Sequence, residues 1–513
     1  MTENAMIIAQ LDAEIELLEN QLILLRRTRN SHTLVNKLPP EVLSEVFLEV
    51  QHSDGVARET YNVIPMTHVC HDWRELALDC ASLWCHIDGS VAKWLDFCWD
   101  RSKEADLIID LPYSILEFPI VATLNQQNHL HQTQAVRLRN NHNRTVFPLL
   151  QNTDYAFPRL EAVWLHKFEL SGPAFSGGAP RLRILVLEDC RVYPSAIKSF
   201  STVTTLVLTR PFDGFLQVQD AITLLSCLPQ VERLLLGQLH SQSTSQPLPP
   251  CHLPHLIFLS LAQVTDKWLT QFLSSINFPD VATVMVGLSA NRNCVEVSRV
   301  LSRYIQGHDC LTMMSGTPDS LRLDFSTLGR PSASGHHFVL DLLFRTGQKD
   351  IFASDVLRTI LPKLPLDSIE RLDLTYDDRL HQEHFCFEHF LNVEILRISD
   401  IHFLLSLKFK SQDPQRFGSS NLAPALRKLI FGSPFDPATL PQDDQLALLQ
   451  TLDARAMVGL VDVIMENRNV QLRARHLPDQ TVVWDTVPVE GYQPDMSLKL
   501  SDALNDWYKL TTQ

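Results

Sequence analysis

Residues 38–50 read LPPEVLSEVFLEV, with two prolines directly before Glu41. Proline at the start of a helix costs no intrahelical hydrogen bond, because the first amides of a helix have no partner there. The apolar residues that follow recur at helical spacing and are Val42, Leu43, Val46, Phe47 and Val50. The stretch therefore predicts a helix that starts at the prolines and carries an apolar ridge.

A polar loop is expected after this helix, over about residues 51–63. Residues 64–87 read IPMTHVCHDWRELALDCASLWCHI and predict a second helix, followed by a short turn. The apolar face of that helix consists of Val69, Cys70, Trp73, Leu76 and Ala77, and the turn contributes Leu83, Trp84 and Ile87. Residues 34–88 are thus predicted to form a small bundle of two or three helices. The prolines at the start of its first helix and the apolar ridge that follows can dock a partner protein.

Three short motifs occur here in order: Leu38-Pro39-Pro40-Glu41-Val42-Leu43, then Val69-Cys70-x-x-Trp73-Arg74, then Leu83-Trp84-x-x-Ile87. Together they resemble an F-box of the kind common in fungi. The loop between the first two helices is longer than in the shortest F-boxes. The resemblance implies docking to the Skp-type adaptor of SCF (cullin–RING) ubiquitin ligases. It places the adaptor contact on Leu38, Pro39, Pro40, Leu43, Val46 and Phe47, and the F-box core on Val69, Cys70, Trp73, Leu76, Leu83, Trp84 and Ile87.

An amphipathic, coiled-coil-like helix is predicted upstream, over residues 5–30. Its apolar residues alternate between spacings of three and four, with Ile8, Ile15 and Leu22 at heptad position a and Leu11, Leu18 and Leu25 at position d. Isoleucine at a with leucine at d favours a parallel dimer. Two features oppose it, because Glu14 would face Glu19 of the second copy and Leu17, Ile23 and Leu24 widen the apolar face. Docking on its own chain or on a partner is the alternative.

A repeated pattern, apolar-x-x-apolar-x-apolar, runs through residues 130–432. Its clearest copies begin at Leu160, Leu182, Val203, Val231, Leu256, Val281, Ile369 and Val393, with weaker copies near Thr133, Pro318 and Leu426. The first six follow one another at steps of 21 to 28 residues, which is the period of leucine-rich repeats. One such unit cannot bury its apolar residues alone, whereas stacked units share a continuous core. The pattern predicts an irregular solenoid, because the usual asparagine after the third apolar residue is largely missing.

Two parts of the chain depart from this pattern. The break at about 288–368 contains HFVLDLLFRTG at 337–347, which is helix-like and could hide degenerate repeats. Residues 440–513 no longer repeat and are expected to form a C-terminal capping segment, which covers the exposed end of the core. Alternatively, residues 474–490 run back into the groove of the solenoid.

The residues between and beside the anchors, which are the apolar residues of the repeated pattern, are expected to line a concave face that recruits a protein. The candidates are Trp164, Val186, Phe258, Arg322, Asp324, Arg371, Asp373 and Arg397. They pass from apolar to mixed-charge character along the chain, which suits a peptide or a folded protein as partner. A slip of one residue in the register would exchange this set for the anchors.

Composition excludes several functions. The 513 residues carry 59 Asp and Glu against 44 Lys and Arg, a net charge of −15, which disfavours nucleic acid and anionic membranes. No phosphate-cradling glycine loop and no nucleophile elbow occurs, so we expect no enzyme. The stretch HQEHFCFEHF at 381–390 misses the spacing of known zinc motifs, and we expect no metal or other cofactor. Without a signal peptide or an apolar span, cytoplasm or nucleus is expected.

The sequence thus predicts an α/β chain, with a helix and a small helical F-box followed by an irregular leucine-rich-repeat solenoid. The resemblance implies a non-catalytic substrate receptor of an SCF ligase, which binds the Skp-type adaptor through the F-box and an unknown protein target through the repeats. The alternative is an interaction scaffold outside the ubiquitin system, whose F-box caps the solenoid. A third reading, a hydrolase on a degenerate α/β fold, lacks a nucleophile.

Overall fold

The computed structural model describes most of the N-terminal half and the strand segments of the C-terminal half. The described residues are 3–53, 59–88, 92–111, 129–140, 156–170, 175, 178–198, 200–210, 217–239, 248–279, 282–289, 295–317, 320–327, 338–343, 361–375, 389–398, 425–431, 460–465, 470–476 and 482–488. They form two compact units. The first holds the residues up to 186 together with 190–202, and the second holds residues 187–189 and those from 203 onward.

The first unit begins with helices. Helix α1 spans Glu3–Ser31, the 3-10 turn η1 spans Val35–Lys37, and α2 spans Pro40–Ser53 with a proline as its first residue. Helices α3 (Glu59–Thr67) and α4 (His71–Asp79) follow, and the 3-10 turn η2 (Ala81–Trp84) closes this helical module, defined as residues 34–88. A loop is expected over about residues 51–63, because that stretch is polar. Instead, α2 continues to Ser53 and α3 already begins at Glu59.

The single helix expected over residues 64–80 is in fact two helices, because the chain turns at Cys70. The backbone of Cys70 is extended, with φ −157° and ψ 175°, and its Sγ accepts a hydrogen bond from the amide of Trp73 at 3.5 Å. Cys70 thus caps α4 in the way that a serine would. Val69 lies in the turn and is 58% exposed, so it is not part of the core to which the sequence assigned it.

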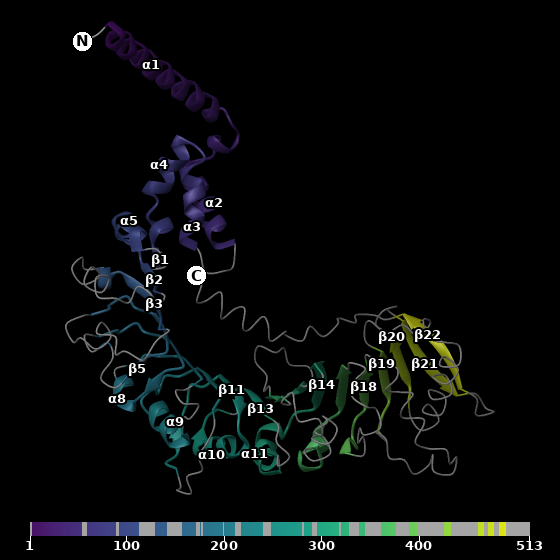
Figure 1. Cartoon of the computed structure of the whole chain (residues 1–513). Coiled ribbons are helices and arrows are strands. Elements are labelled where there is room, and N and C mark those ends of the chain that lie inside the picture. Colours follow the sequence, from purple (N-terminus) through teal and green to yellow (C-terminus); the bar gives the residue numbers. More distant parts are fainter. Residues whose placement is uncertain are drawn as a thin grey trace. The chain divides into compact units, whose positions relative to one another are not determined.

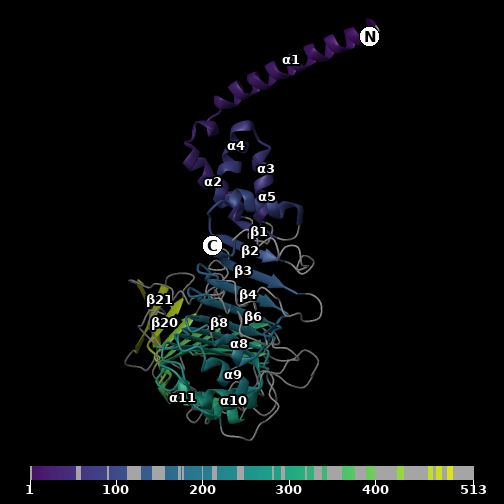
Figure 2. The same cartoon turned by 90° about the vertical axis from the view of Figure 1, so that its left-hand side faces the viewer.

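The helical module continues directly into a parallel sheet. Strand β1 (His86–Asp88) pairs with β2 (Leu107–Leu111), with Ile87 opposite Ile109, and α5 (Ala92–Ser102) connects them. The ring of Trp84 meets Phe97 of α5 edge-on at 5.0 Å between centroids. Strands β3 (Thr133–Arg139) and β4 (Ala162–His166) extend the sheet in parallel (Figure 2). The residue patterns of the sequence do not predict β1, α5 or β2.

Short elements complete the first unit. The 3-10 turn η4 spans His129–His131, β5 (Glu169–Leu170) pairs in parallel with β7 (Arg191–Val192), and α8 spans Pro194–Ile197. Strand β6 (Ile184–Glu188) contains the boundary between the units.

The second unit opens with four parallel strands in chain order: β8 (Thr205–Thr209), β9 (Arg233–Gly237), β11 (Phe258–Val264) and β13 (Thr283–Ser289). Helices α9 (Val218–Leu225), α10 (Asp266–Ser275) and α11 (Val295–Ile305) lie between strands in the sequence. Strands β10 (Cys251–His252) and β12 (Ile276–Asn277) form a separate parallel pair.

The break in the repeat pattern contains three strands: β14 (Cys310–Thr317), β15 (Ser320–Ser326) and β16 (Phe338–Leu343). Strand β16 pairs in parallel with β13, and β15 lies antiparallel between β16 and β14. The helix expected over 337–347 is therefore wrong for residues 338–343, because this apolar run extends the sheet beside β13. The weak repeat near Pro318 corresponds to a strand of reversed direction.

The sheet then continues in parallel from β14 through β17 (Arg371–Thr375), β18 (Ile395–Ile398), β19 (Lys428–Phe431) and β20 (Asp462–Met465) (Figure 1). The turns η6 (Leu361–Lys363) and η7 (Leu366–Ser368) precede β17. Strands β21 (Val470–His476) and β22 (Val482–Pro488) form an antiparallel hairpin on β20. The described parts of 474–490 thus extend the edge of the sheet and do not enter a groove.

The anchors form the core beneath these strands. In the eight clearest copies every described anchor side chain is at most 3% exposed, and Val281 lies outside the described residues. Two residues after the last anchor, five non-glycine residues adopt a positive φ: Lys167, Asp189, Arg210, Gln238 and Gln263, at 47–62°. Such a conformation is uncommon outside glycine. This conformation recurs at the same place in five copies of the pattern, so these copies share a backbone geometry.

Candidate protein-binding site

Helix α2 carries two apolar faces. Leu43 and Phe47 point into the helical module and are 6% and 1% exposed. The ring of Phe47 lies 4.9 Å from that of Trp73 on α4, centroid to centroid. One turn further on, the side chain of Gln51 donates a 3.2 Å hydrogen bond to the carbonyl of Leu83. This inner face holds α2 against α4 and η2.

The other face of α2 is exposed. Val42, Val46 and Val50 recur every four residues, and Leu38 lies just ahead of them. Their exposed fractions are between 40% and 47%, although each side chain is apolar. Four large apolar side chains in line on one surface are a feature of protein interfaces. We call Leu38, Val42, Val46 and Val50 the outward stripe.

The residues to which the sequence assigned the adaptor contact lie on both faces of α2. Val46 and Leu38 lie in the outward stripe, and Pro39 and Pro40 are exposed. Leu43 and Phe47 are buried within the helical module and belong to its core. Val42 and Val50 were not among the predicted contact residues. Their spacing of four was a sufficient signal, because residues i, i+4 and i+8 share one helix face.

The side chain of Asn36 makes hydrogen bonds that position the segment before α2. The indole Nε1 of Trp73 donates to Oδ1 of Asn36 at 2.6 Å, and Nδ2 of Asn36 donates to the carbonyl of Asn30 at 2.9 Å. Asn36 therefore ties the end of α1 and the turn η1 to α4. The backbone then enters α2 with a 3.0 Å bond from the amide of Leu43 to the carbonyl of Pro39.

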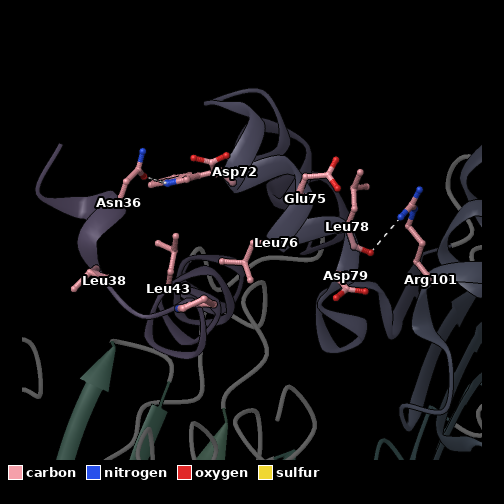
Figure 3. A pocket seen from close by; sticks show the side chains of 11 residues that line it. Asn36, Leu38, Leu43, Asp72, Glu75, Leu76, Leu78, Asp79 and Arg101 are labelled. Atoms are coloured by element: carbon pink, nitrogen blue, oxygen red, sulfur yellow. Dashed lines mark hydrogen bonds between the residues drawn. The ribbon is translucent and has the colours of Figure 1, made fainter. Parts of the chain in front are cut away.

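A pocket of about 650 Å³ lies beside this segment. Figure 3 shows Asn36 and Leu38 on its η1 side and the α4 residues Asp72, Glu75 and Leu78 on the other. Arg101 of α5 donates to the carbonyl of Leu78 at 3.2 Å. Nearby, Lys103 contacts Asp79 at 2.7 Å, and its hydrogen bond and charge lower the pKa of that exposed carboxyl. The pocket is thus lined by apolar and polar side chains together, with the carboxylates of Asp72, Glu75 and Asp79 among them.

The remaining residues of the predicted core lie mostly inside the helical module. Leu83, Trp84 and Ile87 are at most 1% exposed, and the indole of Trp84 donates to the carbonyl of Ala77 at 2.7 Å. Cys70, Trp73 and Leu76 are half-buried.

The predicted concave face is only partly available to a partner. Val186 and Asp373 are 4% and 6% exposed, so they are buried. The guanidinium of Arg371 contacts Asp373 twice, with Nε and Nη2 each 2.9 Å from a carboxylate oxygen. The half-buried candidates are Trp164 in the first unit and Phe258, Arg322, Asp324, Arg371 and Arg397 in the second.

Neighbouring strands bring three of these residues of the second unit close together, with Thr312 between two of them. Asp324 and Asp373 each lie opposite Thr312, and Asp373 lies opposite Arg397. In the first unit, Trp164 lies opposite Arg137, whose guanidinium is 3.5 Å from the indole centroid. The polar residues between the anchors therefore follow the strand register that the repeats predicted.

Other chemistry has little support in the described residues. Within them, no group of three His, Cys, Asp or Glu side chains is arranged to hold a metal ion. The candidate stretch at 381–390 lies outside them except for its last two residues. Among the described helices, none combines the length and the apolar character that crossing a membrane requires.

Comparison with known proteins gives one result that bears on this site. No curated protein sequence matches the chain. Residues 35–90 match the family model described as F-box-like. The match covers α2, α3, α4 and η2, and it includes the exposed Leu38 and the whole of the outward stripe. The helical module of this chain is therefore an F-box-like domain.

Proposed function

We propose that the chain is a non-catalytic substrate-receptor subunit of an SCF (cullin–RING) ubiquitin ligase, acting in the cytoplasm or the nucleus. The outward stripe binds the Skp-type adaptor, and the sheet recruits a target protein. The observation that carries this proposal is the exposed apolar row on α2 within a segment that matches an F-box-like domain. The chain itself contributes proximity, since it holds the target near a ubiquitin-loaded enzyme.

The stripe contributes part of the free energy that such docking needs. Full burial of an aliphatic side chain contributes about 1.5–3 kcal/mol. Because the four residues of the stripe are 40–47% exposed, covering them supplies about 2.5–5 kcal/mol. The pocket beside Leu38 offers further complementarity.

We further propose that the strands are an irregular leucine-rich-repeat solenoid. The buried anchors at steps of 21 to 28 residues, the parallel pairing of successive strands and the recurring left-handed residue support this reading. The half-buried face between the anchors then offers polar and aromatic side chains to a protein target. Balanced charges on that face, such as Asp324 and Arg397, suit a folded or peptide partner better than nucleic acid.

A scaffold outside the ubiquitin system is the second candidate. It is favoured by β1, which joins the helical module to the sheet through its pairing with β2. In that reading the module serves only as a cap. However, the cap is made by η2, β1 and α5, and it leaves the outward stripe exposed. Capping and adaptor binding therefore use different surfaces and are compatible.

Co-purification with the Skp-type adaptor tests the proposal. The informative variant is Val42→Asp with Val46→Asp, because both side chains are exposed and the fold should tolerate the change. We expect wild type to capture the adaptor and the variant to lose capture at unchanged melting temperature. Ile257→Asp is the matched control, since Ile257 is 49% exposed on the second unit and should bind normally. Well-folded wild type that captures no adaptor would refute the ubiquitin-ligase role and leave the scaffold.

A further inference from the structure

Helix α1 presents an uncovered heptad seam. It is continuous over Glu3–Ser31, and every side chain from Asn4 to Arg29 is exposed. The six seam residues are Ile8, Leu11, Ile15, Leu18, Leu22 and Leu25, each 46–69% exposed. No described part of the chain covers them, so docking of this helix on its own described fold does not occur. Among the described residues the seam is therefore open to a partner.

The identities along the seam point to a second copy of the same helix. Position a carries Ile8, Ile15 and Leu22, and position d carries leucine throughout. A β-branched residue at a with leucine at d packs best in a parallel two-stranded coiled coil. The flanking positions e and g are mostly polar, with Asp12, Glu14, Glu19, Gln21 and Arg26. A seam of this width is filled by one other helix.

We propose that the chain self-associates through a parallel, in-register coiled coil of α1. The area suits a reversible dimer. Covering the exposed halves of twelve seam side chains removes roughly 500 Å² of apolar surface. The aliphatic stems beside the seam add a comparable amount. The total is near the lower limit for a specific interface of about 1,000 Å². The dimer should therefore form and dissociate with concentration.

Glu14 and Glu19 oppose the dimer only weakly. Glu14 at position g of one helix faces Glu19 at position e of the other, twice per dimer. Both side chains are exposed in the free chain, so water and salt screen their repulsion. Leu17, Ile23 and Leu24 lie at positions b and c, away from the seam, and stay exposed in the dimer. The repulsion between Glu14 and Glu19, and the exposure of the apolar residues at positions b and c, can therefore each be tested by substitution.

Sedimentation of the full chain over a range of concentrations tests the proposal. We expect wild type to shift from monomer to dimer as its concentration rises, and Leu18→Glu to remain a monomer. Leu24→Glu is the matched control, because Leu24 is as exposed as Leu18, at 62% against 57%, but lies off the seam. It should dimerise like wild type. Equal melting temperatures of both variants would show that the folded units are intact.

Two further variants test the arrangement of the helices. Glu19→Lys turns two like-charged contacts with Glu14 into opposite-charged ones and should tighten the dimer by about tenfold. Leu11→Cys places a thiol at a d position, where a parallel pair brings equivalent residues together. Mild oxidation should then cross-link this variant as a dimer and leave wild type uncross-linked.

Wild type that stays monomeric at every concentration overturns the proposal. Equal loss of the dimer in Leu18→Glu and Leu24→Glu also overturns it, because the contact would then not follow the heptad seam. A dimer that Leu11→Cys fails to cross-link overturns the parallel arrangement. None of these outcomes depends on adaptor binding, since α1 precedes the matched F-box-like segment. In a dimer, two receptors would act together on a target with more than one binding site.

Discussion

The indole of Trp73 and the side-chain amide of Asn36 are joined by a 2.6 Å hydrogen bond across 37 residues of chain. The bond links α4 to the turn that immediately precedes Leu38. Because Asn36 also bonds the carbonyl of Asn30, one side chain fixes the start of the outward stripe relative to the rest of the helical module. The exposed surface is thereby held by a half-buried network of hydrogen bonds.

Replacing Asn36 should therefore weaken adaptor binding without touching the stripe itself. Asn36→Ala removes the hydrogen bonds with Trp73 and Asn30 and the longer one to Cys70 Sγ. A net loss of about 1–3 kcal/mol in the free energy of unfolding follows. Trp73→Phe is the graded comparison, because it loses one bond and keeps the ring contact with Phe47. Thermal melting and calorimetric titration with the adaptor measure both effects. Normal binding by a destabilised Asn36→Ala would show that Leu38 does not need this support.

The two faces of α2 should separate stability from binding. Phe47→Ala removes a side chain that is 1% exposed and should lower the free energy of unfolding by about 3–5 kcal/mol. Val46→Ala, one residue earlier and 42% exposed, should change it by less than about 0.5 kcal/mol and yet weaken adaptor capture. Denaturant unfolding followed by adaptor titration compares the two. Similar stability losses in both variants would contradict the assignment of the faces.

The ion pair between Arg371 and Asp373 should contribute to the stability of the folded chain. The side chains of both residues are less than 15% exposed, and the contact is bidentate. Asp373→Ala leaves the guanidinium of Arg371 partly buried without this carboxylate. It should lower the free energy of unfolding by about 3–5 kcal/mol. The pair of changes Arg371→Met and Asp373→Leu should be far less destabilising, since it removes both charges together. A mild effect of Asp373→Ala alone would show that water reaches the pair.

Residue patterns were sufficient for some of these features. The anchors could be found because each strand repeats the same local requirement, two or three apolar side chains on one face. Strands β1 and β2 could not, since three and five residues without the repeated pattern acquire their structure from pairing with one another. Phe338–Leu343 reads as a helix in isolation but becomes a strand beside β13. The faces of α2 depend on where α4 packs, which a ridge of five apolar residues does not determine.

The thiol of Cys310 should resist alkylation. Burial raises its pKa to about 12, from an ordinary value near 9, and the charge of Asp373 adds to the shift. Because the folded pKa lies above the unfolded one, its stabilising contribution is full below pH 9 and is lost as the pH rises toward 12. Iodoacetamide labelling at pH 8.5, read by mass spectrometry, should modify half-buried Cys80 well before Cys310. Equal labelling rates would mean that this part of the sheet opens easily.

The pairing of β1 with β2 should couple the F-box-like domain to the sheet of the first unit. Ile87 is fully buried opposite Ile109, and the amide of Ile108 donates to the carbonyl of Cys85 at 2.9 Å. Ile87→Ala should therefore speed hydrogen exchange both in η2 and in β2, because a cavity under β1 weakens both sides. Val50→Ala, on the exposed face of α2, is the control and should change neither. Faster exchange confined to η2 would show that the domain and the sheet open independently. A coupled response would mean that an adaptor bound to the stripe and a target bound to these first strands are held at a fixed separation, as proximity catalysis requires.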